Sequence, residues 1–221
     1  TGKTYQARQQ TSLLFDIWKE EFAPKSALTY ESQIELVQFH PSFSYEDFME
    51  GLRPILDGNG AAQLTLQNGV FKEFCRNAGK WEIDVCGLGL DRDWESITID
   101  ELRPHREKLS GDHWQYIFEI SDASKLVSDA VPPFFFIIDE VNRAELSRVF
   151  GELMYCLEYR GIKGGVKTQY ANLNNEGTGM LQTDQGYLFF IPTNIYLIGT
   201  MNTIDRSVES FDFALRRRFR W

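Results

Sequence analysis

Apolar residues recur along this chain in short blocks that follow first one periodicity and then another. Five apolar residues run without interruption from Phe134 to Ile138, and Ile195 to Ile198 forms a second such run. A continuous apolar run that ends at a turn is typical of a strand buried on both faces, as in a parallel sheet. Residues 34–39 form a third apolar-rich segment that we also expect to be a strand.

The segments between these strands have helical spacing. After the Phe134 run, apolar residues return at steps of three and four, at Leu146, Val149, Phe150, Leu153, Met154 and Leu157. This spacing predicts a helix with one apolar stripe, which ends before Gly161. Further helices are expected after Lys3, over residues 70–78 and over residues 211–217. The order of strands and helices predicts a parallel α/β sheet that binds its ligands at the carboxyl ends of the strands.

Two stretches interrupt the alternation of predicted strands and helices. Residues 79–130 are the least regular part of the chain, and we expect them to be an insertion between core strands. Residues 161–191 are rich in Gly, Asn and Thr, which predicts a hairpin or loop insert. The whole chain, residues 1–221, is therefore predicted to be one α/β domain with insertions.

Composition narrows the class of protein. The chain has 221 residues, a formal net charge of −9 and 43% hydrophobic residues, which suits a folded domain. No apolar run approaches the ~18 residues of a membrane-spanning helix, so no contact with a membrane is expected. The cysteines Cys75, Cys86 and Cys156 are odd in number and form no CxxC motif. They are interpreted as free thiols, and the protein is predicted to be cytoplasmic.

Gly2, Lys3 and Thr4 match the last three positions of the phosphate-binding loop G-x-x-x-x-G-K-[ST]. In that loop backbone N–H groups and the lysine bind phosphates, and the hydroxyl holds Mg²⁺. Three residues alone are a weak signal, and a solvated amino-terminal segment is the alternative. The first part of the loop does not precede them.

Asp139 and Glu140 follow the Phe134 strand directly. An aspartate at that place can bind Mg²⁺, and the next glutamate can polarise a water molecule for attack on a γ-phosphate. The alternative is a pair of solvated acids at the end of a strand. The buried run in front of the pair favours the catalytic interpretation.

Polar residues also follow the last predicted strand. Asn202 could reach a γ-phosphate, although an asparagine in a turn is common. Asp205 and Arg206 taken alone would be a surface ion pair. The triplet Arg216 to Arg218 is either a cap at the end of a helix or an arginine finger that enters the site of a neighbouring subunit.

The order of these motifs resembles the AAA+ plan, and three segments resemble the McrB family of AAA+ proteins. They are Val37 to Pro54, Ile137 to Glu158 and Ile198 to Phe219. The most specific part is Met201 to Ser207, which matches the family element Met-Asn-Thr-x-Asp-Arg-Ser throughout.

The resemblance implies a role for each motif. Gly2, Lys3 and Thr4 correspond to Walker A, Asp139 and Glu140 to Walker B, with Asn142 and Arg143 as its extension. Asn202 corresponds to sensor 1, Asp205 and Arg206 to the signature pair, and Arg217 and Arg218 to the finger. The implied bound species are Mg²⁺, held by Thr4 and Asp139, and GTP or ATP.

The resemblance also implies a fold and an assembly. The fold is the large subdomain of an AAA+ P-loop NTPase, here cut within Walker A and before the carboxyl-terminal lid. The family forms a hexameric ring that works with an McrC-like endonuclease on DNA in restriction and defence. Two alternatives remain open: a MoxR-like or dynein-related ATPase that remodels proteins, and a scaffold subunit that binds nucleotide without hydrolysing it.

Overall fold

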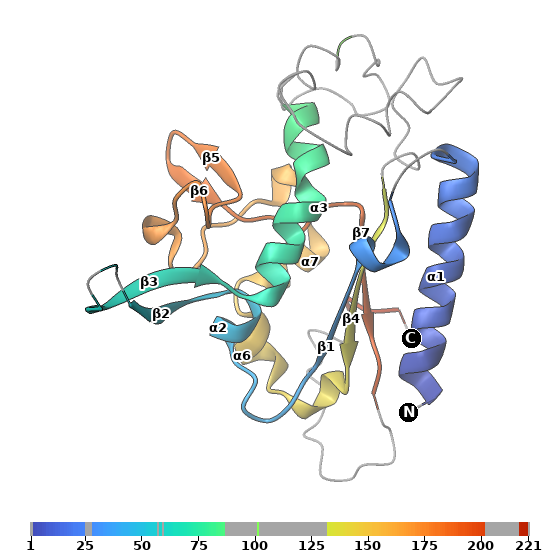
Figure 1. Ribbon diagram of the computed structural model, residues 1–221, viewed down its shortest axis with the longest axis horizontal. Coiled ribbons are helices and arrows are strands. Elements are labelled where there is room, and N and C mark those ends of the chain that lie inside the picture. Colours follow the sequence, from blue (N-terminus) through green and yellow to red (C-terminus); the bar gives the residue numbers. More distant parts are fainter. Residues whose placement is uncertain are drawn as a thin grey trace.

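Three parallel strands form the sheet on which the rest of the molecule is built (Figure 1). The computed structural model describes residues 2–24, 28–56, 58, 60–86, 101, 132–201 and 217–220. Within them β4 (Phe134–Asp139) lies between β1 (Ile34–Gln38) and β7 (Ile195–Gly199). Both pairings are parallel, so the three strands end at the same edge of the sheet. The predicted parallel α/β fold is confirmed.

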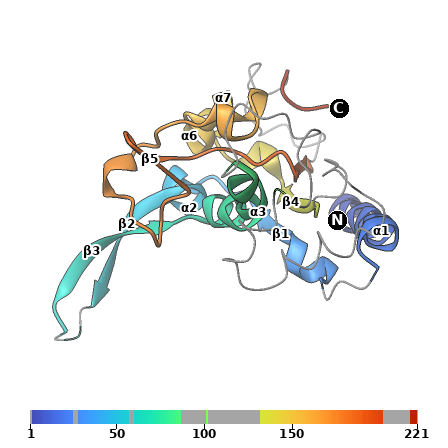
Figure 2. The same cartoon turned by 90° about the horizontal axis from the view of Figure 1, so that it is seen from above.

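Helices cover both faces of this sheet (Figures 1 and 2). The helix α1 (Gly2–Phe22) packs on one face, and α3 (Val70–Cys86) packs on the other. Successive side chains of a strand point to opposite sides. Because helices cover both sides, the side chains of the middle strand are buried on both faces. Phe136 faces the ring of Phe71 on α3, and Phe135 faces Tyr30 on the side of α1. This arrangement explains the continuous apolar run in the sequence.

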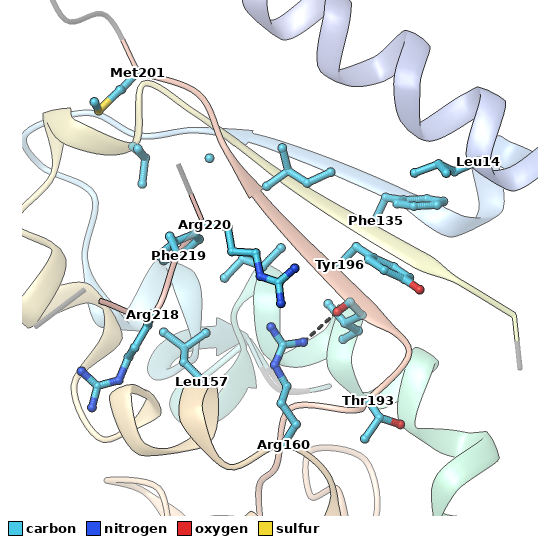
Figure 3. Close-up of a pocket in the computed structure, with 15 residues that line it drawn as sticks. Leu14, Phe135, Leu157, Arg160, Thr193, Tyr196, Met201, Arg218, Phe219 and Arg220 are labelled. Atoms are coloured by element: carbon cyan, nitrogen blue, oxygen red, sulfur yellow. Dashed lines mark hydrogen bonds between the residues drawn. The ribbon is translucent and has the colours of Figure 1, made fainter. Parts of the chain in front are cut away.

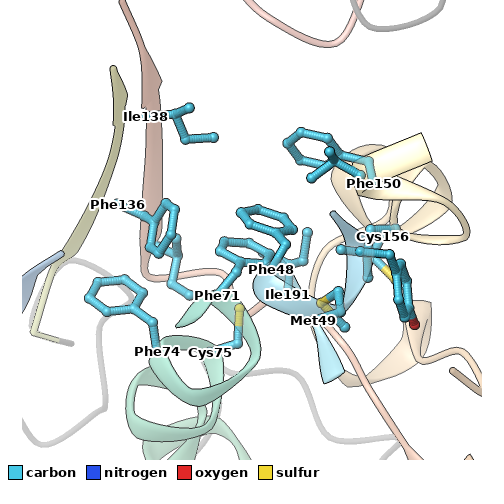
Figure 4. Close-up of a cluster of buried hydrophobic side chains, with 14 of the residues drawn as sticks. Phe48, Met49, Phe71, Phe74, Cys75, Phe136, Ile138, Phe150, Cys156 and Ile191 are labelled. Atoms are coloured by element: carbon cyan, nitrogen blue, oxygen red, sulfur yellow. The ribbon is translucent and has the colours of Figure 1, made fainter. Parts of the chain in front are cut away.

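Aromatic rings fill the core between the sheet, α3 and two short helices, α2 (Tyr45–Phe48) and α6 (Leu146–Phe150) (Figure 4). Phe48 stacks on Phe71 with ring centroids 4.6 Å apart. The same ring meets Phe136 edge-on at 5.9 Å and Phe150 at 5.0 Å. Tilted and edge-on pairs add to the stabilisation that burial alone provides, so this cluster fixes the position of the middle strand.

The prediction of a single helix over residues 146–157 is wrong. The chain forms two short helices instead, α6 and α7 (Leu153–Glu158). Gly151 separates them with φ 47° and ψ −125°, a conformation that essentially only glycine adopts. The apolar stripe continues across the break, because Val149, Phe150 and Leu153 are all buried.

Two antiparallel hairpins complete the described fold. The hairpin of β2 (Glu50–Leu56) and β3 (Ala62–Asn68) was not predicted and extends away from α1 (Figures 1 and 2). The hairpin of β5 (Leu181–Thr183) and β6 (Gly186–Leu188) confirms the hairpin expected within residues 161–191. Short 3₁₀ turns connect the elements, at Tyr30–Gln33, Val141–Arg143, Ile162–Gly164 and Ala171–Leu173.

The predicted insertion is described only at its beginning. The helix α3 continues to Cys86 instead of ending at residue 78, and the remainder of residues 79–130, apart from residue 101, lies outside the described residues. The helix predicted over residues 211–217 lies outside them too, except Arg217, which is in a turn.

Cys75 and Cys156 are buried free thiols, as the sequence predicted. Burial raises the pKa of both thiols, that of Cys156 to about 12. A helix long and apolar enough for a bilayer was not found in the described part of the chain.

Candidate active site

The polar residues predicted to be functional meet at the carboxyl edge of the sheet. Backbone hydrogen bonds tie the three strand ends together there. Asp139 O accepts from the N–H of Phe39 at 2.9 Å, and Ile138 O accepts from the N–H of Thr200 at 2.8 Å. Val141 in turn donates its N–H to Thr200 O at 2.9 Å. Asp139 therefore occupies a fixed place between the ends of β1 and β7.

The carboxylate of Asp139 is held by hydroxyl and amide donors. It accepts hydrogen bonds from the hydroxyls of Thr200 and Thr4 and from the N–H of Glu140, the last at 3.1 Å. Burial by itself raises the pKa of Asp139, but these donors outweigh it and hold the pKa below its ordinary value. Asp139 is therefore a carboxylate at neutral pH, as a ligand of a divalent cation has to be.

The start of α1 reaches the same edge. Lys3 donates from Nζ to the carbonyl oxygen of Met201, at 2.8 Å, just beyond the end of β7. The side chain of Thr4, one residue on, bonds to Asp139. The first N–H groups of a helix and its dipole attract anions. The predicted phosphate-binding and carboxylate motifs, far apart in sequence, are thus adjacent in the structure.

Glu140 has a backbone that few residues adopt. Its φ is 54° and its ψ is 44°, the left-handed region, and it is the one such non-glycine residue among those described. This conformation costs of order 1–3 kcal/mol, and residues that keep such strain cluster at functional sites. The carboxylate accepts a hydrogen bond from the Gln38 amide at 2.9 Å and pairs with Arg143 Nε at 3.1 Å. Its direction is therefore set from two sides.

The donor set fits Mg²⁺ bound together with phosphates. Thr4 and Asp139 offer two oxygen ligands next to the helix start that would receive the phosphates. The described residues contain no group of three or more His, Cys, Asp or Glu side chains able to hold a metal ion. Mg²⁺ commonly keeps several waters and is bound by one or two protein oxygens plus substrate phosphates, which is the arrangement that these residues allow.

The predicted finger arginines lie elsewhere. Arg217 and Arg218 are in a turn, and Arg218 Nη2 donates to Glu158 of α7 at 2.9 Å. Asn202, Asp205, Arg206 and Arg216 lie outside the described residues. The described structure thus brings together Lys3, Thr4, Asp139 and Glu140, and holds Arg218 against its own chain.

A groove of about 690 Å³ runs along β7, which is an edge strand of the described sheet (Figure 3). Its lining is largely apolar, with Arg160, Arg218 and Arg220 and no acidic residue. Arg160 donates to Ile195 O at 2.7 Å. Only one end of the groove, at Met201, reaches the carboxyl edge. The candidate active site is therefore at the edge and not in this groove.

Two residues that contact the acidic pair Asp139 and Glu140 were not predicted from the sequence. Gln38 bonds to Glu140 and Thr200 bonds to Asp139. Their positions carried a usable signal, because Gln38 is the last residue of β1 and Thr200 follows β7 directly. Polar residues at the carboxyl ends of parallel strands gather at one edge.

Comparison with known proteins gives two matches. Residues 19–219 match the family described as the AAA domain (dynein-related subfamily). Over 220 residues, 99% of the chain, the sequence is 32% identical to the Type IV methyl-directed restriction enzyme EcoKMcrB subunit of Escherichia coli (strain K12). The chain spans about a third of the length of that relative, 32%. Both matches agree with the resemblance seen in the sequence.

Proposed function

This chain belongs to the dynein-related subfamily of AAA domains, and from that premise we propose that it hydrolyses a nucleoside triphosphate, GTP or ATP, with Mg²⁺. The observation that carries the proposal is the contact of Thr4 with Asp139. It joins the start of a long helix, where phosphates bind favourably, to the acidic pair Asp139 and Glu140.

In this proposal the start of α1 binds the phosphates of the nucleotide. Gly2, Lys3 and Thr4 would receive the phosphates through backbone N–H groups and the ammonium group of Lys3. Lys3 now donates to Met201 O, so a phosphate would compete with that carbonyl for the same donor. Thr4 and Asp139 would hold Mg²⁺, which neutralises phosphate charge when bound.

Glu140 would act as the general base of hydrolysis and would orient and deprotonate the attacking water. Gln38 and Arg143 keep its carboxylate in place. Asn202 would contact the γ-phosphate, and Asp205 and Arg206 would contribute at the interface between subunits. Arg217 and Arg218 are the candidate fingers for a neighbouring site, worth about 10³–10⁵ in rate where such fingers operate.

The assembly that we propose is a hexameric ring acting on DNA in restriction and defence, with an McrC-like endonuclease, in the cytoplasm. One fact supports it. The similar protein of Escherichia coli is named as a subunit of a methyl-directed restriction enzyme.

A second candidate function is ATP-driven remodelling of proteins, as in MoxR-like or dynein-related ATPases. The family description, dynein-related, favours it. Stimulation of hydrolysis by DNA and a nuclease subunit would support the first candidate, and stimulation by an unfolded protein would support the second. Nucleotide binding without any turnover would point instead to a scaffold subunit.

The first prediction tests the role of Glu140. In the intact protein, Glu140→Gln should lower the rate of hydrolysis by about 10²–10⁴, the usual contribution of a general base. Nucleotide binding should persist, because Lys3, Thr4 and Asp139 are unchanged. The measurements are phosphate release at saturating nucleotide and binding by calorimetry.

The matched control is Glu145→Gln, which removes the same charge from an exposed residue five positions away whose side chain makes no capping bond. This variant should hydrolyse at the wild-type rate. Unchanged turnover in Glu140→Gln would exclude Glu140 as the base.

A further inference from the structure

Two consecutive residues after β7 contact both the acid and the lysine of the candidate active site. Thr200 donates its hydroxyl to Oδ1 of Asp139. Met201, the next residue, accepts the hydrogen bond from Lys3 with its carbonyl oxygen, at 2.8 Å. The end of β7 therefore links the acidic pair to the start of α1, and Thr200 is the one of the two residues that uses its side chain.

The backbone fixes Thr200 independently of its hydroxyl. Its N–H donates to Ile138 O at 2.8 Å, and its carbonyl oxygen accepts from the N–H of Val141 at 2.9 Å. Gly199, just before it, packs so closely on Val141 that an added Cβ would lie 3.3 Å from Cγ1 of that valine. Thr200 itself is 9% exposed. The hydroxyl is thus held on a rigid support, as a group that orients another side chain has to be.

The two oxygens of the Asp139 carboxylate have different surroundings. Oδ1 accepts from the hydroxyl of Thr200 and from the N–H of Glu140, the latter at 3.1 Å. An ionised carboxylate offers about two lone-pair positions on each oxygen, so these donors occupy the positions of Oδ1. Oδ2 is therefore the oxygen that remains for a cation held jointly with Thr4, whose side chain bonds to the same carboxylate.

The hydroxyl of Thr200 decides which oxygen takes which place. Rotation about the last bond of an aspartate side chain is soft and nearly two-fold, because that bond joins sp³ and sp² carbons. The contact from Glu140 comes from the adjacent residue, whereas Thr200 approaches from another strand, 61 positions along the chain. Groups that orient a metal ligand from behind commonly contribute about 10–100-fold to metal affinity.

We propose that Thr200 is a positioning residue for the magnesium ion of the proposed function: its hydroxyl holds Oδ1 of Asp139 and leaves Oδ2 for Mg²⁺. The inference rests on the proposed function and deepens it, because it names a residue that neither binds phosphate nor reacts with water. A threonine that only satisfies a polar group at the end of a strand would contribute to stability, and its loss would leave the effect of Mg²⁺ unchanged.

The test measures how strongly Mg²⁺ tightens nucleotide binding. Calorimetry of the intact protein gives the Kd of the β,γ-imido analogues of GTP and ATP, once in EDTA and once with excess Mg²⁺. The first Kd divided by the second is the Mg²⁺ factor. Thr200→Val keeps the shape of the side chain and removes the hydroxyl. It should lower the Mg²⁺ factor about tenfold and leave the Kd in EDTA at the wild-type value.

Two variants control for a simple loss of structure. Thr200→Ser keeps a hydroxyl and should retain most of the Mg²⁺ factor. Thr183→Val removes a hydroxyl that donates to Gly186 O at 2.7 Å in the β5–β6 hairpin, and it should behave like the wild type. A wild-type Mg²⁺ factor in Thr200→Val, or an equal loss in Thr200→Ser, would overturn the proposal.

A double-mutant cycle tests whether Thr200 acts through Asp139. Asp139→Asn should itself lower the Mg²⁺ factor, because a neutral amide replaces the anionic ligand. Adding Thr200→Val should lower the factor no further, since the carboxylate that the hydroxyl orients is already gone. If the effects of the two substitutions instead multiply, Thr200 acts by another route and the proposal is wrong.

The positioning role and the proposed hydrolysis fail separately. If the wild type releases phosphate from GTP or ATP and Thr200→Val has the full Mg²⁺ factor, hydrolysis stands and the positioning role fails. If the wild type binds nucleotide more tightly with Mg²⁺ but releases no phosphate, and Thr200→Val loses the factor, the positioning role stands and hydrolysis fails. Wild-type binding that is equal with and without Mg²⁺ would overturn the magnesium site on which both rest.

Discussion

Gln38 and Arg143 approach the carboxylate of Glu140 from different elements, the end of β1 and the turn after β4. Neither side chain needs to touch a substrate to matter. A carboxylate that must hold one water in line gains rate from neighbours that fix its rotamer, and loss of such a supporting contact commonly costs 10–100-fold.

The Gln38→Leu variant isolates this contribution. It removes the amide donor and keeps a side chain of similar size at the end of β1. We expect kcat to fall by about tenfold while KM changes little, because the phosphate-binding residues remain. Steady-state kinetics of the intact protein measures both constants, with the exposed Gln10→Leu as control. An unchanged or raised kcat would show that Gln38 does not position Glu140.

Single residues were predictable where a local pattern marked them. Asp139 and Glu140 follow five apolar residues, and Lys3 and Thr4 belong to a recognisable motif. Gln38 and Thr200 could not be paired with these acids from sequence, because their contacts depend on strand register across separations of 102 and 61 residues. The left-handed backbone of Glu140 likewise follows from how the turn is tied to Thr200.

Among the elements, the break between α6 and α7 shows that the backbone conformation of one residue can end a helix within a continuous apolar stripe. The stripe predicts a continuous helix, yet Gly151 turns the chain at φ 47°. A side chain here would be strained even though the nearest atoms, on Tyr45, are 3.6 Å from the added carbon. The cost is therefore conformational and not steric crowding.

Gly151→Ala should lower the free energy of unfolding by about 1–3 kcal/mol. The measurement is urea denaturation of the intact protein. Gly58→Ala is the control, because its added carbon meets no atom within 4 Å and its φ is not positive. Equal stability of the two variants would mean that the helix pair tolerates a different turn.

The β2–β3 hairpin escaped prediction for a related reason. Its apolar residues alternate as in a strand, but Pro54 lies in the middle of β2. Proline within an apparent strand normally argues against it and is tolerated at edges. Only the tertiary setting, in which both strands stand away from the central sheet, resolves the conflict.

At the scale of the whole molecule, the alternating order of strands and helices was enough to predict a parallel sheet whose carboxyl edge gathers the candidate residues. The tie between the β2–β3 hairpin, α3 and the 161–191 segment was not predictable, because it consists of one buried ion pair between residues 22 positions apart, Glu50 and Lys72, and an asparagine about 100 positions further on, Asn174. Burial alone raises the pKa of Glu50, but hydrogen bonds from Lys72, Thr168 and Asn174 hold it below its ordinary value of 4.5.

This pKa makes stability depend on pH in a definite direction. A carboxyl group with a lowered folded pKa adds stability above its unfolded pKa and loses it as pH falls through the folded pKa. Glu50→Gln should cost about 3–5 kcal/mol at neutral pH, since Lys72 is left buried without its counter-charge. The difference from wild type should shrink below about pH 4.

Urea denaturation of the intact protein at pH 7 and near pH 3.5 measures that difference. The exposed Glu176→Gln should be neutral at both pH values. A deficit of Glu50→Gln that is the same at both pH values would mean that packing, and not the ion pair, ties the three elements together.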